Sequence, residues 1–226
     1  SEKMYGGTCI NIACIPTKTL AHEAKLLSGR EERDFAQKTA DYARAVARKD
    51  EVTGFLRQKN LEMLTGKGVA VLTGQASFVS SHEVEVRFAD GHAERLDGEN
   101  IYINTGAYSV IPPIEGLAES ANIHTSASLL DLKRLPRELV ILGAGYIALE
   151  MASMYAEFGS RVTMLEYGRR FLPREDEDVA QSVRAALEAR GVRIYLGVSA
   201  QAVRDVNEDG TMRTELRCLM SMPGGA

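Results

Sequence analysis

The sequence lacks the features by which secreted, membrane and nucleic-acid-binding proteins are usually recognised. Three cysteines in 226 residues are too few to suggest a secreted disulfide framework. No apolar run approaches the roughly 18 residues needed to cross a membrane, and no signal peptide is visible. A formal net charge of -4 provides no basic footprint for nucleic acid. We therefore expect a cytoplasmic protein that binds neither membranes nor nucleic acid.

What is present is the composition of an ordinary globular protein. Hydrophobic residues make up 45% of the chain and charged residues 26%, which are typical values. A chain of this length can bury one large core or two small ones. Because it begins at Ser1 and reaches its most informative segment almost at once, we expect it to be a fragment of a longer protein.

That segment holds two cysteines, Cys9 and Cys14, five positions apart. A disulfide would close so short a loop that it would remove little chain entropy, so a structural staple is a weak explanation. Pro16 suits the first turn of a helix, whose positive end would favour a thiolate at Cys14, and Lys18 adds a cation one turn further on. Together these features predict a reactive dithiol. At this spacing alone, two small buried hydrophobic residues would be the commoner interpretation.

A metal site is not expected in this segment. Structural zinc sites need four ligands, usually in closely spaced pairs. His22 is the only other nearby candidate, and Cys218 lies far along the chain.

The apolar periodicity predicts helices in the first third of the chain and short strands after them. Helical spacing predicts a helix over residues 16–27 and a long helix, or a helix pair, over 30–64. After Gly68 the period changes to two, which predicts strands over residues 69–72, 76–79, 84–88 and 100–104.

The second half alternates between strands and helices. A strand over 139–142 leads into the G-x-G-x-x-A turn of residues 143–148, a helix ending at Phe158 and a strand over 161–166, which together predict a βαβ unit. Gly143 permits the tight turn and Gly145 lets a pyrophosphate approach the helix N-terminus. We also expect helices over 126–132 and 176–190, a strand over 192–196 and a hairpin over 200–216.

Residues 6–18 resemble the active-site segment of the class I pyridine nucleotide-disulfide oxidoreductases, which include dihydrolipoamide dehydrogenase, glutathione reductase and mercuric reductase. The longer run from Met4 to Leu20 is most similar to one bacterial branch, the reactive-chlorine-resistance flavoproteins or hypothiocyanous acid reductases. Thr105-Gly106 is similar to the family's turn that passes close to FAD. The sequence departs from the family pattern at Ala13, where glycine is usual, and at Asn104, where alanine is common.

The resemblance implies an α/β fold with two domains. Residues 1–116 would form a partial FAD-binding domain of helices plus a small β-meander, with the dithiol, and residues 117–226 a Rossmann-like NAD(P)-binding domain, incomplete at its C-terminus. The family's first FAD motif and its C-terminal dimerisation domain are absent from the sequence. The complete protein would be a homodimer.

The resemblance also implies roles for individual residues. Cys14 matches the flavin-proximal thiol and Cys9 the interchange thiol that attacks the substrate, while Lys18 and Glu150 match a pair that meets beside the flavin; these four are the expected catalytic residues. Tyr146 matches an aromatic residue that covers the flavin until nicotinamide enters. The expected cofactor-binding residues are Gly7, Thr8, Cys14, Lys18, Thr105, Gly106, Gly143, Gly145, Tyr146, Ile147, Glu150, Glu166 and Arg169.

The choice of nicotinamide nucleotide depends on the end of the strand over 161–166. The Glu166 carboxylate can accept hydrogen bonds from ribose hydroxyls and would repel a 2′-phosphate, which favours NADH. Arg169 and Arg170 follow within reach and could bind that phosphate, so NADPH is the alternative.

The expected function is that of an FAD-dependent NAD(P)H oxidoreductase. Electrons would pass through the flavin to a Cys9–Cys14 disulfide and on to a small-molecule oxidant or disulfide, with reactive chlorine species or hypothiocyanous acid favoured. One alternative is a mercuric or cupric ion reductase, or an enzyme like dihydrolipoamide dehydrogenase. The other is a catalytically inactive fragment that only binds nicotinamide nucleotide.

Overall fold

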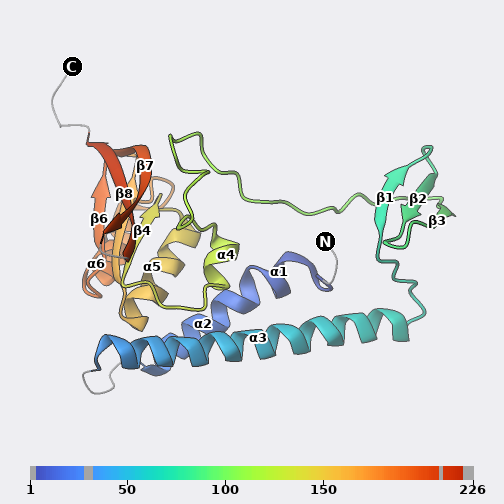
Figure 1. The fold of residues 1–226 in the computed structure, drawn as a ribbon, viewed down its shortest axis with the longest axis horizontal. Helices are drawn as coiled ribbons and strands as arrows, with labels where there is room; N and C mark the ends of the chain where they lie inside the picture. The colour runs from blue at the N-terminus through green and yellow to red at the C-terminus, as the bar shows by residue number, and fades with distance from the viewer. Residues whose placement is uncertain (1–3, 28–32, 209–210, 221–226) are drawn as a thin grey trace.

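The computed structural model describes residues 4–27, 33–208 and 211–220 (Figure 1). Its N-terminal part is helical, with α1 (Gly7–Asn11), α2 (Cys14–Leu27) and α3 (Phe35–Gly66). Helix α1 contacts both α2 and α3. The predicted helix over 16–27 is confirmed and begins two residues earlier, and the predicted long stretch is one helix; residues 30–32 at its start lie outside the described residues. A capping box between Asp34 and Gln37 fixes the start of α3.

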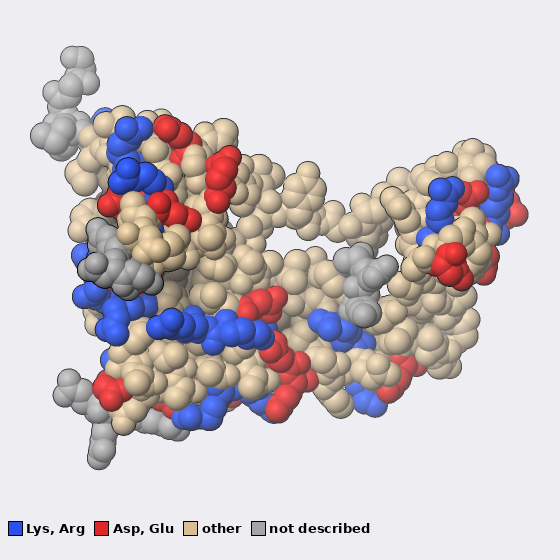
Figure 2. Space-filling model, viewed as in Figure 1, with Lys and Arg blue, Asp and Glu red and all other residues tan. Residues whose placement is uncertain are grey.

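A small antiparallel sheet follows α3, in the order β1 (Gln75–Phe78), β2 (Glu83–Arg87) and β3 (Ala93–Asp97). It stands apart from the rest of the molecule and is connected back to it by an extended arm, residues 98–114 (Figure 1). Residues 100–114 of the arm carry no charged side chain. In Figure 2 this part of the arm is therefore tan, whereas the small sheet and the body of the molecule on either side of it carry both positive and negative side chains.

Two of the predicted strands are wrong. Residues 69–72 and 100–104 form no strand, and the side chains of Tyr102 and Ile103 are 89% and 73% exposed. Alternating apolar residues suit a strand, but a strand forms only where a neighbouring strand accepts its backbone hydrogen bonds. Within the described part of the chain, neither segment pairs with another strand.

The predicted βαβ unit is present in the second half. Strand β4 (Glu138–Leu142), helix α5 (Tyr146–Phe158) and strand β5 (Arg161–Glu166) are followed by α6 (Glu177–Glu188) and β6 (Arg193–Leu196). The three strands form a parallel sheet in the order β4-β5-β6. Helix α4 (Ser126–Leu130) precedes them and confirms the predicted short helix.

The C-terminal hairpin is longer than predicted. Strands β7 (Val198–Glu208) and β8 (Thr211–Met220) pair antiparallel, and β7 is hydrogen-bonded to the end of the arm through Val203 N and Glu115 O at 2.7 Å. Gly116 has a φ of +73°, and a Cβ atom there would lie 2.1 Å from Val203 O. This close approach therefore requires glycine.

One hydrophobic core joins the two halves of the sequence. It contains buried side chains from α2, α3, α5 and β5, including Leu20, Tyr42, Tyr155, Phe158 and Met164. Because α2 packs directly against α5, the helix that begins at Cys14 lies beside the helix that follows the glycine-rich turn.

Candidate functional site

The two cysteines of the dithiol (Cys9 and Cys14) lie on different helices. Cys9 is in α1 and Cys14 is the first residue of α2, and both are exposed free thiols. A hydrogen bond between the two side chains raises the pKa of Cys9 above its ordinary value of 9.0, and slight burial and the charge of Cys14 add to the shift. Neither cysteine is the small buried residue of the alternative interpretation. The Cys9 thiol therefore holds its proton more tightly than an isolated cysteine does.

Glycine is required where the chain turns into α1. Gly6 and Gly7 have φ angles of +94° and +65°, which residues with a side chain rarely adopt. A Cβ atom at Gly6 would lie 2.4 Å from Ile10 Cδ1. Gly7 and Thr8, both expected at a cofactor, are exposed at the start of this helix.

Asn11 anchors the dithiol segment (residues 5–14), and it was not among the residues expected from the sequence. Its side chain is 9% exposed, and its amide nitrogen donates to Gly7 O at 2.7 Å and to Tyr5 O at 3.3 Å. Its amide oxygen accepts from Arg57 Nε of α3 at 2.7 Å. The position of Asn11 between the cysteines was a signal that could have been used. Arg57, 46 residues away, gave none.

Lys18 of α2 and Glu150 of α5 form an ion pair. The structure therefore brings together two residues that are 132 positions apart in the sequence and that the resemblance implied as partners. Both side chains are partly exposed to solvent. Beside them a shallow hollow of about 330 Å³ lies between α2, α5 and α6, with Ala21, Leu149 and Met154 among its apolar lining.

The glycine-rich turn leaves space for a ligand at the N-terminus of α5. Gly143 has a φ of +103°, and a Cβ atom at Gly143 or Gly145 would meet no protein atom within 4 Å. No side chain caps α5, so its first N–H groups can meet a phosphate, as at other helix N-termini. Tyr146 and Ile147 are exposed beside the turn. These features fit the pyrophosphate of a dinucleotide.

Glu166, the last residue of β5, is hydrogen-bonded to the turn. One carboxylate oxygen accepts from Ala144 N at 2.8 Å and the other from Gly168 N at 2.7 Å. Arg169 is exposed in the loop that follows, where it lines a second hollow of about 530 Å³ together with Tyr167, Gly168, Gly197, Ser199, Leu219 and Met220. The carboxylate and the guanidinium that the sequence analysis weighed against each other both lie at the end of β5.

Tyr146 is held away from the core by its hydroxyl. That hydroxyl donates to Glu175 Oε1 at 2.5 Å, and this hydrogen bond raises the pKa of Tyr146 above its ordinary value. The side chain is 60% exposed, so the ring lies at the surface beside the loop that leads into α6.

Thr105 and Gly106 do not join the other expected residues. They lie in the exposed arm, which runs from the β1-β2-β3 sheet to the body of the molecule (Figure 1). Cys14 and the Lys18–Glu150 pair lie close together through α2, whereas Thr105 and Gly106, which were also expected at FAD, lie apart from them. The fit to FAD is incomplete within this chain.

Two features are absent from the described residues. In that part of the chain no three or more histidine, cysteine or acidic side chains gather closely enough to hold a metal ion. Over the same residues, no helix combines the length and the apolar character needed to cross a membrane.

Comparison with known proteins identifies relatives that match 90% of the chain. The chain is 46% identical over 204 residues to the probable pyridine nucleotide-disulfide oxidoreductase RclA of Escherichia coli K12, which covers 90% of this chain and 43% of RclA. It is 33% identical to the dihydrolipoyl dehydrogenase of Acholeplasma laidlawii over 90% of the chain and 62% of that enzyme. A mercuric reductase of Lysinibacillus sphaericus is 32% identical over 90% of the chain and 37% of that protein.

Comparison with solved structures also points to RclA. The solved structure of the HOCl-induced flavoprotein disulfide reductase RclA from Escherichia coli superposes with a TM-score of 0.80 at 41% identity, over 95% of this chain and 47% of that one. This chain thus spans less than half the length of RclA. The sequence pattern of the family described as pyridine nucleotide-disulphide oxidoreductase matches residues 3–219. The chain therefore belongs to the pyridine nucleotide-disulphide oxidoreductase family.

Proposed function

We propose that this chain carries the dithiol and the nicotinamide-nucleotide site of an FAD-dependent NAD(P)H oxidoreductase. Residues 1–116 are its partial FAD-binding domain and residues 117–226 its NAD(P)-binding domain. The observation that carries the proposal is the contact between Lys18 and Glu150. Lys18 is one helical turn from Cys14, and Glu150 is one turn from Tyr146 at the glycine-rich turn, about 6 Å along each helix axis. The Lys18–Glu150 pair therefore joins the helix that carries the dithiol to the helix that begins at the proposed nucleotide site.

The nucleotide is proposed to be NADH, bound at the N-terminus of α5. Gly143 and Gly145 leave room for the pyrophosphate, and the unpaired N–H groups of α5 meet its charge. The Glu166 carboxylate at the end of β5 would repel a 2′-phosphate. Arg169 is the residue that would instead support NADPH. Bound FAD would supply the two-electron relay between the nicotinamide and the disulfide.

At the dithiol, Cys9 attacks a disulfide substrate and Cys14 resolves the product. In the proposed reactive state the dithiol carries one proton, on Cys9, and this proton passes to the Cys14 thiolate as the Cys9 sulfur bonds to one substrate sulfur and expels the other as a thiolate. That thiolate takes the proton from Cys14, whose sulfur then attacks Cys9 and expels the second thiolate. The dithiol is oxidised to a Cys9–Cys14 disulfide, and the substrate disulfide is reduced to one thiol and one thiolate.

A hypohalous oxidant would react by the same route. Cys9 takes the electrophilic chlorine of hypochlorous acid and releases hydroxide, which accepts the remaining proton of the pair. Cys14 then displaces chloride and closes the disulfide. Hypothiocyanous acid would release thiocyanate in place of chloride. The similarity to RclA, described as HOCl-induced, supports this choice of substrate.

A second candidate is the reduction of a soft metal ion. Two exposed thiols whose side chains interact can bind such an ion. RclA has been solved as a Cu(II) complex, and mercuric reductases are among the relatives. Hg(II) and Cu(II) are therefore the metal substrates to test, with dihydrolipoamide as the remaining alternative.

The test is a visible spectrum of the purified chain with added FAD, and of the full-length protein, before and after one equivalent of NADH without oxygen. The full-length protein, which we propose to be a homodimer, is expected to gain a long-wavelength thiolate–flavin band that a Cys14→Ser variant lacks. A chain that binds NADH but never FAD is the inactive fragment of the alternative.

Turnover then separates the substrates. NADH oxidation by the full-length protein is measured with hypothiocyanous acid, a small disulfide, Cu(II) or Hg(II). A Cys9→Ser variant that turned over its best oxidant at the wild-type rate would overturn the proposed role of Cys9.

A further inference from the structure

Helix α1, which carries Cys9, cannot fix its own position. It has five residues, far fewer than an isolated helix needs to be stable in water. It follows two glycines with positive φ angles, where the backbone has unusual freedom. Its orientation relative to Cys14 must therefore be set by contacts with other elements.

Asn11 makes the contact that sets this orientation. An arginine can only donate hydrogen bonds, so the bond from Arg57 Nε requires the amide oxygen of Asn11 to face α3. The amide nitrogen then faces the opposite way, where it donates to Gly7 O and Tyr5 O on either side of the turn into α1. Arg57 thus decides which way the Asn11 amide points.

Among the described residues, Arg57 is not paired with a carboxylate, and it is carried by the long helix α3. It lies on α3 along one line with Lys49 and Tyr42, at intervals of about two helical turns. Those two residues bond to Asp131 and to Leu132 O beyond α4. Helix α3 therefore connects the dithiol segment to the nucleotide-binding half.

We propose that Arg57 is a positioning residue of the dithiol, acting through Asn11 to hold Cys9 within reach of Cys14. This inference rests on the proposed dithiol chemistry and names a residue that serves it. Holding two reacting groups together raises their effective concentration. The Cys9–Cys14 disulfide is therefore more stable with Arg57 than without it.

The test is the thiol–disulfide equilibrium of the chain with glutathione, in which the dithiol and one glutathione disulfide give the protein disulfide and two glutathione thiols. It is measured by alkylation and mass spectrometry, with Cys218→Ala in every protein. We expect Arg57→Leu to lower the equilibrium constant about tenfold, since one charge-assisted hydrogen bond is lost. Arg57→Lys should recover part of the loss, because its ammonium group can still donate to Asn11.

Arg48→Leu is the matched control. Arg48 lies on the same helix and is exposed, and its one ion pair among the described residues is with Glu51 on α3. This variant should leave the equilibrium constant unchanged. Thermal unfolding of every variant shows whether a change in the constant is separate from a change in stability.

An unchanged constant in a folded Arg57→Leu protein would overturn the proposal, even if that protein were less stable, because Arg57 would then be only structural. If Arg57→Leu does not fold, Arg57→Gln replaces it, since its shorter side chain cannot span the same distance and the same result overturns the proposal. The measurement uses neither flavin nor nucleotide. A wild-type chain that formed no Cys9–Cys14 disulfide would overturn the proposed function as well, whereas equal constants overturn this inference alone.

Discussion

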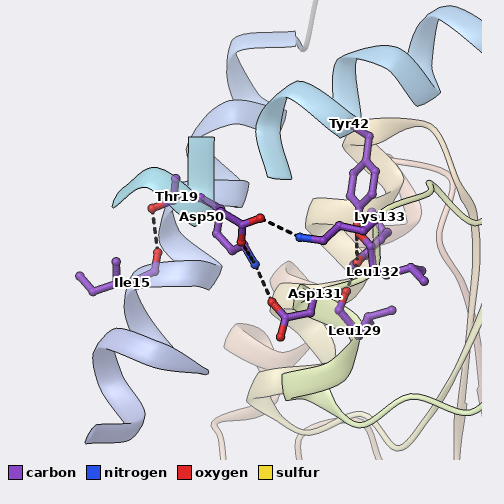
Figure 3. Close-up of polar contacts among 10 residues, drawn as sticks. Ile15, Thr19, Tyr42, Asp50, Leu129, Asp131, Leu132 and Lys133 are labelled. Atoms are coloured by element: carbon purple, nitrogen blue, oxygen red, sulfur yellow. Dashed lines mark hydrogen bonds and ion pairs between the residues drawn. The ribbon is translucent and has the colours of Figure 1, made fainter. Parts of the chain in front are cut away.

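The hydroxyl oxygens of Tyr42 on α3 and Tyr155 on α5 lie 3.0 Å apart in a contact closed to solvent. Tyr42 also donates to Leu132 O at 2.8 Å, and Tyr155 to Leu129 O at 2.8 Å. The two hydroxyl protons are therefore shared among three contacts, namely the one between the tyrosines and the two with the carbonyl oxygens of Leu132 and Leu129. Figure 3 shows Tyr42 directed toward Leu129 and Leu132 at the end of α4. The tyrosine pair joins α3 and α5 to the segment between them.

Replacing Tyr155 by phenylalanine tests the strength of this junction. The change removes one donor from a fully buried network while the ring remains. We expect the free energy of unfolding to fall by about 1–2 kcal/mol, the cost of a lost buried hydrogen bond. Urea denaturation measures it, with Tyr102→Phe in the exposed arm as the control that should change nothing. Equal midpoints for the two variants would contradict the prediction.

The same tyrosines predict a loss of stability at high pH. Burial, the largest cause, raises the pKa of both Tyr42 and Tyr155 above the ordinary value of 10.0. The folded chain therefore holds their protons more tightly than the unfolded chain. Above about pH 10 the unfolded chain binds fewer protons, so the free energy of unfolding falls as the pH rises.

Urea titrations at intervals between pH 7 and pH 11 measure this slope. Tyr155→Phe should make the decline above pH 10 shallower, because one of the shifted groups is gone. Lys49 contributes to the same window, since its pKa is also raised, so part of the slope should remain. A wild-type slope in Tyr155→Phe would show that Tyr155 ionises normally.

Lys49 of α3 forms an ion pair with the segment that follows α4. Its side chain is 3% exposed, and its ammonium group contacts Asp131 at 2.6 Å and Asp50 at 2.7 Å. Burial alone would lower the pKa of Lys49, but hydrogen bonds to Asp131 and Asp50 more than offset this and raise it. Asp50 also contacts Lys133 Nζ at 2.7 Å, and Figure 3 shows these two side chains directed toward each other.

Lys49→Met is therefore expected to destabilise the chain by about 1–2 kcal/mol, less than for a fully buried pair because both carboxylates are partly exposed and can be rehydrated. Lys133→Met is the matched control, because Lys133 is largely exposed and reaches the same Asp50. It should cost less than about 0.5 kcal/mol. The result to be compared is the difference between the two urea midpoints, and an equal effect would show that burial of Lys49 is unimportant.

The features that the sequence predicted well are local. The helix that follows the cysteines, the glycine-rich turn and the alternation of β4, α5 and β5 depend on residues within about one element of each other. The contacts of Lys49 with Asp131 and of Arg57 with Asn11 join residues 82 and 46 positions apart, and no periodicity marks such pairs. The wrong strand over 100–104 has the same origin, because its apolar pattern carries no information about which strand would lie beside it.

The interaction between the Cys9 and Cys14 thiols can be tested by alkylation. Since hydrogen bonding to Cys14 is the main cause of the raised pKa of Cys9, Cys14→Ala should bring that pKa back toward 9.0. The rate of iodoacetamide reaction at Cys9 between pH 6 and pH 10 reports it, in a Cys218→Ala background. The half-maximal rate should move to lower pH in the variant. An unmoved profile would mean that the two thiols do not interact.

The two glycines of the turn should differ in what they contribute. Gly143 has a φ of +103°, whereas Gly145 has a φ of -78° that any residue can adopt. Gly143→Ala should therefore lower the free energy of unfolding by about 1–2 kcal/mol, the cost of a left-handed conformation with a side chain. Gly145→Ala should leave stability unchanged, because its Cβ atom meets no protein atom within 4 Å.

Nucleotide binding separates the glycines further. In Gly145→Ala the added methyl group projects into the space proposed for the pyrophosphate, so the affinity of the chain for NADH, measured by calorimetry, should fall at least about tenfold, since one close phosphate contact is worth that much. The loss should appear although the urea midpoint is that of the wild type. Because no protein atom surrounds that methyl group, the affinity can fall only if the ligand itself occupies the space. Wild-type affinity in Gly145→Ala would place the nucleotide elsewhere on the molecule.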